Sequence, residues 1–482
     1  MSKIYERLEY YAEHVGNNPA FTYRVSDKYE SVSYFELKDQ VDALAASLWE
    51  YKSKTIAIIG HNKLEYAVSL LAVLCHIGDA FLIDKELKKE DIENIFARKK
   101  PDLILIDDEL ELFFDEYRIL RFSDVGRMMR TGLKYEYDAV FAGRLILHTS
   151  GTTGEPKCVL LKEENYYGVI PELNRKWEVR SEHSVLYIIP LYHIYALMSL
   201  FHGLYAGSNN ILEWDYKRIS RVLAETKPHL FMGVPLMYNR IRDAALAKAG
   251  WKLLIAVKLS NLLMKCKIDI RKKLFREIYA YFGGNYVFGV SAGSILPYRT
   301  GKFFKDIGLP VYNVYGMTET SGPIAINYKE HNRFDSVGEI LDVNEVKIID
   351  ADENGIGHVC VRGSNVFDGY LKKREENVFN GDYFDTGDLG YIREGYLYVI
   401  GREKDILIGA NGKNIASAEL SGKILECPDI HDCKVIMENN RLIAIVNTDL
   451  SEEELKKYLD KVNSGLPNYK KISDFHIAKK IK

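Results

Sequence analysis

Strand-like and helix-like segments alternate through the first third of this 482-residue chain, and that alternation limits the folds available to it. Short apolar runs typical of strands lie at residues 55–59, 80–83 and 102–106. The segments between them, 64–77 and 89–99, have the length and composition of helices. Strand–helix–strand order at this spacing requires right-handed crossovers and a mostly parallel sheet. The first third therefore predicts an α/β fold.

The same alternation returns in the middle of the chain, and a different pattern follows it. Strand-like and helix-like runs recur at 184–189, 196–204 and 229–232. After residue 335, short segments of alternating hydrophobicity lie between Gly- and Asn-containing turns. Such segments are typical of a small antiparallel sheet or barrel.

The C-terminal part has its own pattern and predicts a second domain. A hairpin-like stretch at 434–447 and a helix at 452–462 indicate a small α+β unit. A chain of this length exceeds what one hydrophobic core usually holds. We expect residues 1–402 to form a large N-terminal domain of layered, mostly parallel α/β sheets with a small β-barrel. Residues 403–482 would form the C-terminal domain, with the boundary near Lys404.

A hydroxyl- and glycine-rich loop directly follows the apolar run at 145–147. Its sequence is Thr149-Ser150-Gly151-Thr152-Thr153-Gly154-Glu155-Pro156-Lys157. Glycine lets the backbone approach a ligand closely, so that successive amides point inward and, with the hydroxyls and the lysine, bind an anion. The loop lacks the Walker spacing, which requires Gly-Lys followed by Ser or Thr. The loop is predicted to bind a polyphosphate; the alternative is a polar surface turn.

Composition excludes some classes of protein. The formal net charge of −3 argues against a nucleic-acid binder that relies on a basic surface. The six cysteines have no metal-ligand spacing, which fits reduced thiols in the cytoplasm. The first residues lack the apolar core of a signal peptide, and no membrane span is expected, because no stretch of 18 uncharged apolar residues occurs.

The segment 251–268 is apolar but carries three regularly spaced lysines. Lys252, Lys258 and Lys265 are six or seven residues apart, so a helix would bring them roughly onto one face. The pattern favours a core-facing helix with a solvated stripe; contact with a membrane surface is the alternative.

Three further motifs carry groups that suit a nucleotide. The first, Tyr315-Gly316-Met317-Thr318-Glu319-Thr320, offers an aromatic face for a base, a hydroxyl for a phosphate and a carboxylate for a metal. The second ends at Asp388, whose carboxylate suits the paired hydroxyls of a ribose, and the third places Arg402 just before the predicted boundary.

In this order the four motifs closely resemble those of the adenylate-forming (ANL) superfamily. The basic segment from Trp251, followed by Phe282-Gly283-Gly284, looks most like its long-chain fatty acid acyl-CoA synthetases. The resemblance implies a large N-terminal domain and a small mobile C-terminal domain that rotates about Lys404. It also implies an ATP-dependent, AMP-forming ligase that activates a medium- or long-chain fatty acid as an acyl-adenylate and transfers it to coenzyme A. The alternatives are a ligase that loads the phosphopantetheine of an acyl carrier protein, or a non-catalytic homologue that binds nucleotide or acyl groups.

The resemblance also assigns roles to residues. Residues 150–157 would hold the β- and γ-phosphates, Thr149 and Glu319 would bind Mg²⁺, and Thr318 would contact the α-phosphate. The catalytic set would be Lys157, Thr318, Glu319 and His193, the last bordering the acyl carboxylate or serving only as a structural histidine. The nucleotide-binding set would be Thr149, Ser150, Gly151, Thr152, Thr153, Gly154, Lys157, Gly293, Ser294, Tyr315, Gly316, Thr318, Asp388 and Arg402.

One expected feature has no clear match. Family members carry a C-terminal lysine that reaches the active site, beyond a Pro-x-Tyr-Lys segment that here ends at Lys470. The candidates are Lys479, Lys480 and Lys482, and the alternative for each is a solvated tail.

Overall fold

The computed structural model describes residues 2–112, 114–133, 142–149, 157–371, 378–408, 414–427, 429–438 and 441–478. The chain divides into two units. Unit 1 comprises Met1–Phe334, Gly338–Glu345 and Gly363–Glu376, and unit 2 comprises Asp335–Val337, Val346–Arg362 and Asn377–Lys482. Both combine helices and sheets, and the α/β class predicted from the sequence is correct.

The first sheet of unit 1 contains the strands predicted from the first third of the chain. Its order is β6-β5-β3-β4-β7-β8, and every neighbouring pair is parallel except β7 and β8. Its central strands are fully buried, as sequences that are apolar after the first residue of β3 and β4 and throughout β5 require. The strands are β3 (Thr55–Ile59), β4 (Asp79–Ile83), β5 (Leu103–Ile106), β6 (Ile119–Arg121), β7 (Leu145–Thr149) and β8 (Lys157–Leu161).

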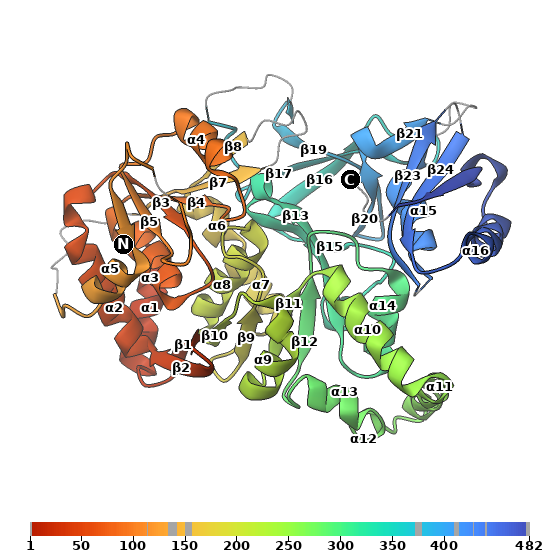
Figure 1. Ribbon diagram of the computed structural model, residues 1–482, viewed down its shortest axis with the longest axis horizontal. Coiled ribbons are helices and arrows are strands. Elements are labelled where there is room, and N and C mark those ends of the chain that lie inside the picture. Colours follow the sequence, from red (N-terminus) through yellow and green to blue (C-terminus); the bar gives the residue numbers. More distant parts are fainter. Residues whose placement is uncertain are drawn as a thin grey trace. The chain divides into compact units, whose positions relative to one another are not determined.

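The second sheet of unit 1 is also parallel through its centre. The order is β2-β1-β10-β9-β11-β12-β13-β14-β15, with antiparallel pairs only at the two ends. Figure 1 shows β9, β10, β11 and β12 side by side. The strands are β1 (Pro19–Val25), β2 (Lys28–Ser33), β9 (Ser184–Tyr187), β10 (Asn209–Leu212), β11 (Leu230–Gly233), β12 (Phe288–Ser291), β13 (Val311–Met317), β14 (Gly322–Ile326) and β15 (Gly338–Ile340).

Helices pack against one another and connect the two sheets of unit 1. Helix α1 contacts α2 and α8, and α2 contacts α3 (Figure 1). Ser33 begins α2 with a capping box, in which its hydroxyl accepts from the Glu36 amide and the Glu36 carboxylate accepts from the Ser33 amide. The helices are α1 (Lys3–His14), α2 (Tyr34–Ser47), α3 (Leu64–Ala72), α4 (Lys89–Arg98), α5 (Phe122–Met128), α6 (Glu163–Gly168), α7 (Ile170–Trp177), α8 (Ile194–Ala206), α9 (Ile219–Thr226), α10 (Pro235–Ala249), α11 (Trp251–Lys265), α12 (Arg271–Leu274), α13 (Arg276–Tyr281) and α14 (Tyr298–Asp306).

Two helical predictions need correction. The helix expected at 64–77 is α-helical only to Ala72, and Val73–Ile77 form a π-helical turn before Gly78. The helix expected to face the core at 251–268 is α11, but most of its apolar side chains are exposed, because it is apolar on two opposite faces and only one of them packs on the protein. Among the described parts of the chain, no helix is long and apolar enough to cross a membrane.

Unit 2 consists mainly of short antiparallel sheets. Strands β16 (Asn344–Ile349), β17 (Gly357–Gly363), β19 (Tyr383–Arg393) and β20 (Tyr396–Arg402) follow one another in a sheet, with β18 (Phe379–Asn380) paired to β19. A smaller α+β part has the predicted hairpin and helix. It contains β21 (Ile406–Ile408), β22 (Asn414–Ala416), α15 (Ser417–Ile424), β23 (Ile430–Glu438), β24 (Arg441–Thr448), α16 (Glu452–Ser464) and β25 (Asp474–Ile477). A closed barrel stays a prediction.

Candidate active site

The carboxyl ends of several parallel strands of unit 1 meet around one cavity. Open α/β sheets bind their ligands at this edge, where the strands end. The cavity has a volume of about 1540 Å³. Its walls near the strand ends are His148 in β7, His193 after β9, Gly293 after β12, and Gly316 and Thr318 at the end of β13.

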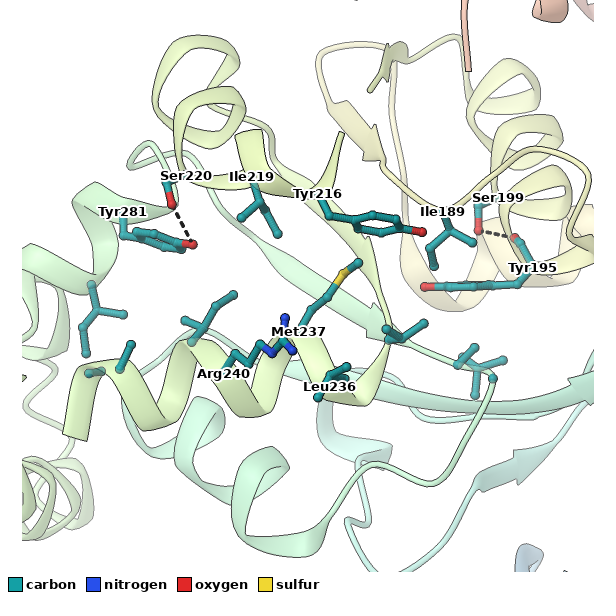
Figure 2. Close-up of a pocket in the computed structure, with 18 of the residues that line it drawn as sticks. Ile189, Tyr195, Ser199, Tyr216, Ile219, Ser220, Leu236, Met237, Arg240 and Tyr281 are labelled. Atoms are coloured by element: carbon teal, nitrogen blue, oxygen red, sulfur yellow. Dashed lines mark hydrogen bonds between the residues drawn. The ribbon is translucent and has the colours of Figure 1, made fainter. Parts of the chain in front are cut away.

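From the strand ends the cavity continues along one face of α10. The residues of α10 that line it recur three or four positions apart, from Leu236 to Ala249, which at 1.5 Å per residue corresponds to about 20 Å of helix. Figure 2 shows Leu236, Met237 and Arg240 facing the cavity, with Tyr216, Ile219 and Tyr281 on the opposite side. Most of the side chains along this path are apolar, so the cavity suits an elongated apolar ligand.

Two tyrosines hold the walls of the cavity. The Tyr195 hydroxyl donates to the Val290 carbonyl at 2.9 Å, while the Ser199 hydroxyl donates to the Tyr195 carbonyl at 2.9 Å (Figure 2). At the other side the Ser220 hydroxyl donates to the Tyr281 hydroxyl at 3.4 Å. Of residues 231–238, which connect β11 to the start of α10, Val234, Leu236 and Met237 line the cavity. The helical stripe on α10 could have been found from the sequence by its spacing.

The hairpin of β7 and β8 holds both ends of the predicted phosphate loop. Thr149 pairs with Lys157 across the hairpin, while Ser150, Gly151, Thr152, Thr153 and Gly154 lie outside the described residues. The Lys157 ammonium lies 4.8 Å from the centroid of the Tyr370 ring. The Tyr370 hydroxyl donates to Glu319 Oε1 at 2.7 Å. Tyr370 therefore connects two residues that the sequence assigned to catalysis.

The Glu319 carboxylate is a buried acidic group. Its residue is only 5% exposed and lies in the 3-10 turn Thr318–Thr320 that follows β13. The Phe367 amide donates to the Glu319 carbonyl at 2.8 Å, so the backbone near Tyr370 also holds this turn. Sequence reasoning did not find Tyr370, because it lies about 50 residues from Glu319 and its Gly-Tyr pair is a weak signal.

Two histidines, His148 and His193, line the part of the cavity near the strand ends. His148 Nε2 accepts from the Asp84 amide at 3.0 Å. The His193 ring lies 4.4 Å from the Tyr192 ring and lines the cavity, and the residue is exposed. Desolvation lowers the pKa of both histidines, and each is neutral at pH 7. Burial and a hydrogen bond to Asp84 raise the pKa of the Tyr192 phenol.

The residues predicted to surround the base come from neighbouring strands. Gly293 follows β12 with φ of 86°. A Cβ there would meet nothing within 4 Å, so the positive φ, and not a close contact, is the reason for glycine at this position. Tyr315 lies in β13, which pairs with β12. A Cβ on Gly316 would lie 1.9 Å from the Gly322 carbonyl oxygen, so this glycine is required by the close approach of β14. Ser294 is exposed and does not line the cavity.

The predicted ribose-binding pair is assembled within unit 2. Asp388 and Arg402 are cross-strand partners on β19 and β20, and Arg402 Nε lies 2.9 Å from Asp388 Oδ1. The Thr386 hydroxyl accepts from the Asp388 amide at 3.1 Å, while Arg402 Nη1 donates to the Thr386 carbonyl at 3.3 Å. Lys404 is exposed in the 3-10 turn Glu403–Asp405. The candidate lysines 479, 480 and 482 fall outside the described residues.

The model of a known enzyme family, the AMP-binding enzymes, matches residues 8–371. The chain belongs to this family. The resemblance to adenylate-forming enzymes inferred from the motifs is thereby confirmed. The match covers about three quarters of this AMP-binding protein and includes the β7–β8 hairpin, the cavity, Glu319 and Tyr370.

Two curated proteins and one solved structure are similar to this chain. Long-chain-fatty-acid–CoA ligase FadD15 of Mycobacterium bovis is 31% identical over 335 residues, which are 63% of this chain and 54% of that protein. This chain thus spans about half the length of that relative. Long-chain-fatty-acid–CoA ligase ACSBG2 of Mus musculus is 24% identical over 94% of this chain and 78% of that protein. The structure of o-succinylbenzoate coenzyme A synthetase (MenE) from Bacillus subtilis, in complex with ATP and magnesium ion, has a TM-score of 0.77 at 22% identity, covering 99% of this chain and 96% of that one, and shows the same fold.

Proposed function

We propose that this protein is an ATP-dependent, AMP-forming ligase that activates a medium- or long-chain fatty acid as its adenylate and transfers the acyl group to coenzyme A. The observation that carries the proposal is the apolar cavity, which leads from the strand ends along about 20 Å of α10. The likeness to FadD15 and ACSBG2 supports a fatty acid, since both are long-chain-fatty-acid–CoA ligases.

The lining of the cavity favours a carboxylate with an apolar tail over an amino acid. Its inner part carries Tyr195, Met198, Ile219, Met237 and Ile241, which offer an alkyl chain apolar contacts. No aspartate and, apart from Glu277 of α13, no glutamate lines the described walls. A substrate ammonium group would therefore meet no acidic side chain among the residues that line the cavity near the strand ends.

In this proposal the carboxylate attacks the α-phosphate of ATP, forming an acyl-phosphate bond and releasing pyrophosphate; a thiol then displaces AMP. The protein supplies position and charge rather than a covalent nucleophile. Lys157 and residues 150–154 would hold the β- and γ-phosphates, Thr318 the α-phosphate, and Tyr315, Gly293, Gly316 and Ser294 the base. The neutral His193, open to the cavity, would donate a hydrogen bond to the acyl carboxylate.

The donor set at Glu319 suits Mg²⁺. Mg²⁺ is usually held by one or two carboxylates together with substrate phosphates and water. Glu319 supplies one buried carboxylate and Thr149 one hydroxyl at the end of β7. No cluster of three or more acidic, His or Cys ligands occurs among the described residues. When bound, the ion would neutralise charge on the phosphates.

The C-terminal part would act as a mobile domain. Residues 403–482 would rotate about the exposed Lys404 between the two half-reactions, with Asp388 and Arg402 binding the ribose. One of the lysines 479, 480 and 482 would reach the reacting carboxylate. The six cysteines, all within the described residues, form no disulfide, which fits a reducing compartment, and we place the reaction in the cytoplasm.

The test is pyrophosphate release with a panel of carboxylic acids. Fatty acids should support release, and Lys157→Ala or Glu319→Ala should lower it by about a hundred- to a thousandfold, the usual effect of removing one preorganised group. Lys162→Ala is the matched control, because this nearby lysine is paired with Asp368 at the surface. Binding of ATP without release for any acid would leave only the non-catalytic homologue.

The second half-reaction needs its own comparison. With the same fatty acid, coenzyme A and a holo-acyl carrier protein are offered as acceptors in separate reactions. We expect acyl-CoA to form. If only the carrier protein is loaded, the acceptor is its phosphopantetheine and not coenzyme A. The proposed adenylation step would be unaffected by that result.

A further inference from the structure

Helix α11 carries a row of large apolar side chains on its exposed face. Trp251 is 67% exposed, Ile255 54% and Leu262 59%, and Leu254 and Leu259 are also exposed. At about 100° per residue, Trp251, Ile255, Leu259 and Leu262 fall within one arc of about 80°. We call these four residues the α11 stripe. Exposed apolar surface of this extent on one element is unusual for a soluble monomer.

Lysines border the α11 stripe on both sides. By the same helical geometry, Lys258 and Lys265 lie on one side of it and Lys252 on the other. The opposite face of the helix, which includes the buried Leu253 and Ser260, packs on the protein. An apolar stripe with an aromatic residue and flanking lysines is the pattern of a helix that lies in a lipid–water interface.

The surroundings of α11 are strongly basic although the protein as a whole is not. Residues 235–281 contain eleven lysines and arginines but only three acidic residues, in a chain of formal net charge −3. The three acidic side chains, Asp243, Asp269 and Glu277, are paired with Arg242, Arg271 and Lys248. The remaining basic groups give this end of unit 1 a charge complementary to an anionic surface.

The cavity reaches the surface next to α11. Leu253 and Ala256, on the packed face of α11, line it, as do the exposed Lys252 and Lys273. Figure 1 shows α11, α12 and α13 together at the end of α10. Lys248 of α10 and Glu277 of α13 form an exposed ion pair, 2.9 Å apart, between cavity-lining elements. Such a surface pair contributes little stability and opens easily.

We propose that the α11 stripe and its lysines dock on an anionic lipid bilayer, so that a fatty acid passes from the membrane into the cavity beside α11. The proposal rests on the proposed function for the identity of the ligand, but the docking itself does not. A second copy of the chain fits this face less well, because two-fold packing of α11 would bring its lysines against one another.

The first experiment measures vesicle binding of the full chain. The probes are phosphatidylcholine vesicles with and without phosphatidylglycerol, and the readouts are co-sedimentation and tryptophan emission. Binding should require phosphatidylglycerol and shift the emission to shorter wavelength, and Trp251→Phe should abolish the shift. The double variant Lys258→Gln with Lys265→Gln should weaken binding about thirtyfold, because each lysine near an anionic surface contributes a factor of about five. Ile255→Ser with Leu262→Ser should weaken it at least tenfold.

Control variants alter similar exposed residues elsewhere in unit 1. Lys28→Gln with Lys100→Gln and, separately, Phe35→Ser should leave vesicle binding unchanged, since all three residues are exposed and none lies near α11. Absence of wild-type binding, or equal weakening by the controls, overturns the proposal. A dimer in sedimentation equilibrium that Ile255→Ser with Leu262→Ser dissociates would instead make the stripe an interface between copies.

Activity separates this proposal from the proposed function. With octanoate in solution, Ile255→Ser with Leu262→Ser should release pyrophosphate at the wild-type rate, because neither residue lines the cavity. With palmitate supplied in phosphatidylglycerol vesicles, the same variant should be at least tenfold slower. Vesicle binding without any pyrophosphate release would reject the ligase and keep the docking surface.

Discussion

Closing the cavity part-way along α10 should change the preference for chain length without abolishing the reaction. Ala244 lines the cavity eight residues after Leu236, which corresponds to about 12 Å along the helix. A phenylalanine at this position would fill the cavity beyond that depth. Leu236 lies near the strand ends, so the reacting carboxylate and the first part of the chain would keep their contacts.

The size of the effect follows from the methylene groups that lose their contacts. Each buried methylene contributes about 0.8 kcal/mol, so the four that separate dodecanoate from hexadecanoate contribute up to about 3 kcal/mol, or about 200-fold in kcat/KM. In the wild type, kcat/KM should rise with chain length up to this limit. In Ala244→Phe it should level off, while octanoate is used at the wild-type rate.

The assay is pyrophosphate release at acid concentrations below micelle formation, for octanoate, dodecanoate and hexadecanoate. Ala247→Phe is the matched control, because Ala247 is an exposed residue of α10 that does not line the cavity. A wild-type protein without chain-length preference, or an Ala244→Phe variant that keeps the wild-type preference, would refute the assignment of this cavity to the alkyl chain.

Three other predictions concern single groups. Tyr370→Phe keeps the ring beside Lys157 but removes the donor to Glu319, and should slow adenylate formation about tenfold, as the loss of a hydrogen bond to a buried charge does; an unchanged rate would remove Tyr370 from the site. Asp388→Asn should raise KM for ATP more than it lowers kcat, and a change confined to kcat would argue against a ribose contact. Burial lowers the pKa of His76 to about 4, so the unfolded chain binds the extra proton between about pH 4 and 6.5 and stability falls as the pH falls through that window. Across the whole window the loss of unfolding free energy is about 3 kcal/mol. Urea denaturation between pH 7 and 5 should show a smaller loss for His76→Gln than for the wild type. An equal loss in both proteins would count against this role of His76.

The strands and the ordered motifs could be predicted from the sequence for physical reasons. The stretches 56–59 and 103–106 are apolar at every position, as the interior of a buried parallel strand must be, and the structure places β3 and β5 there. The motifs had also named Asp388 and Arg402, which form an ion pair, and Glu319 and Lys157, which both contact Tyr370.

The remaining features depend on contacts between distant parts of the chain. Tyr370 meets Glu319 and Lys157 only after β8 and the segment around Phe367 come together. The cavity depends on how α10 lies opposite α9 and α13, which local periodicity does not determine. In α11 the lysine spacing was recognised, but apolar residues on both faces left it open which face packs on the protein.

The most direct test of the account is detection of the acyl-adenylate itself. The protein is incubated with ATP, Mg²⁺ and hexadecanoate without a thiol, and the quenched reaction is analysed by mass spectrometry. We predict hexadecanoyl-AMP with the wild type and with Lys162→Ala, and at least a hundredfold less with Glu319→Ala. Absence of any acyl-adenylate across the carboxylic acid panel, or equal amounts from Glu319→Ala, would contradict the account.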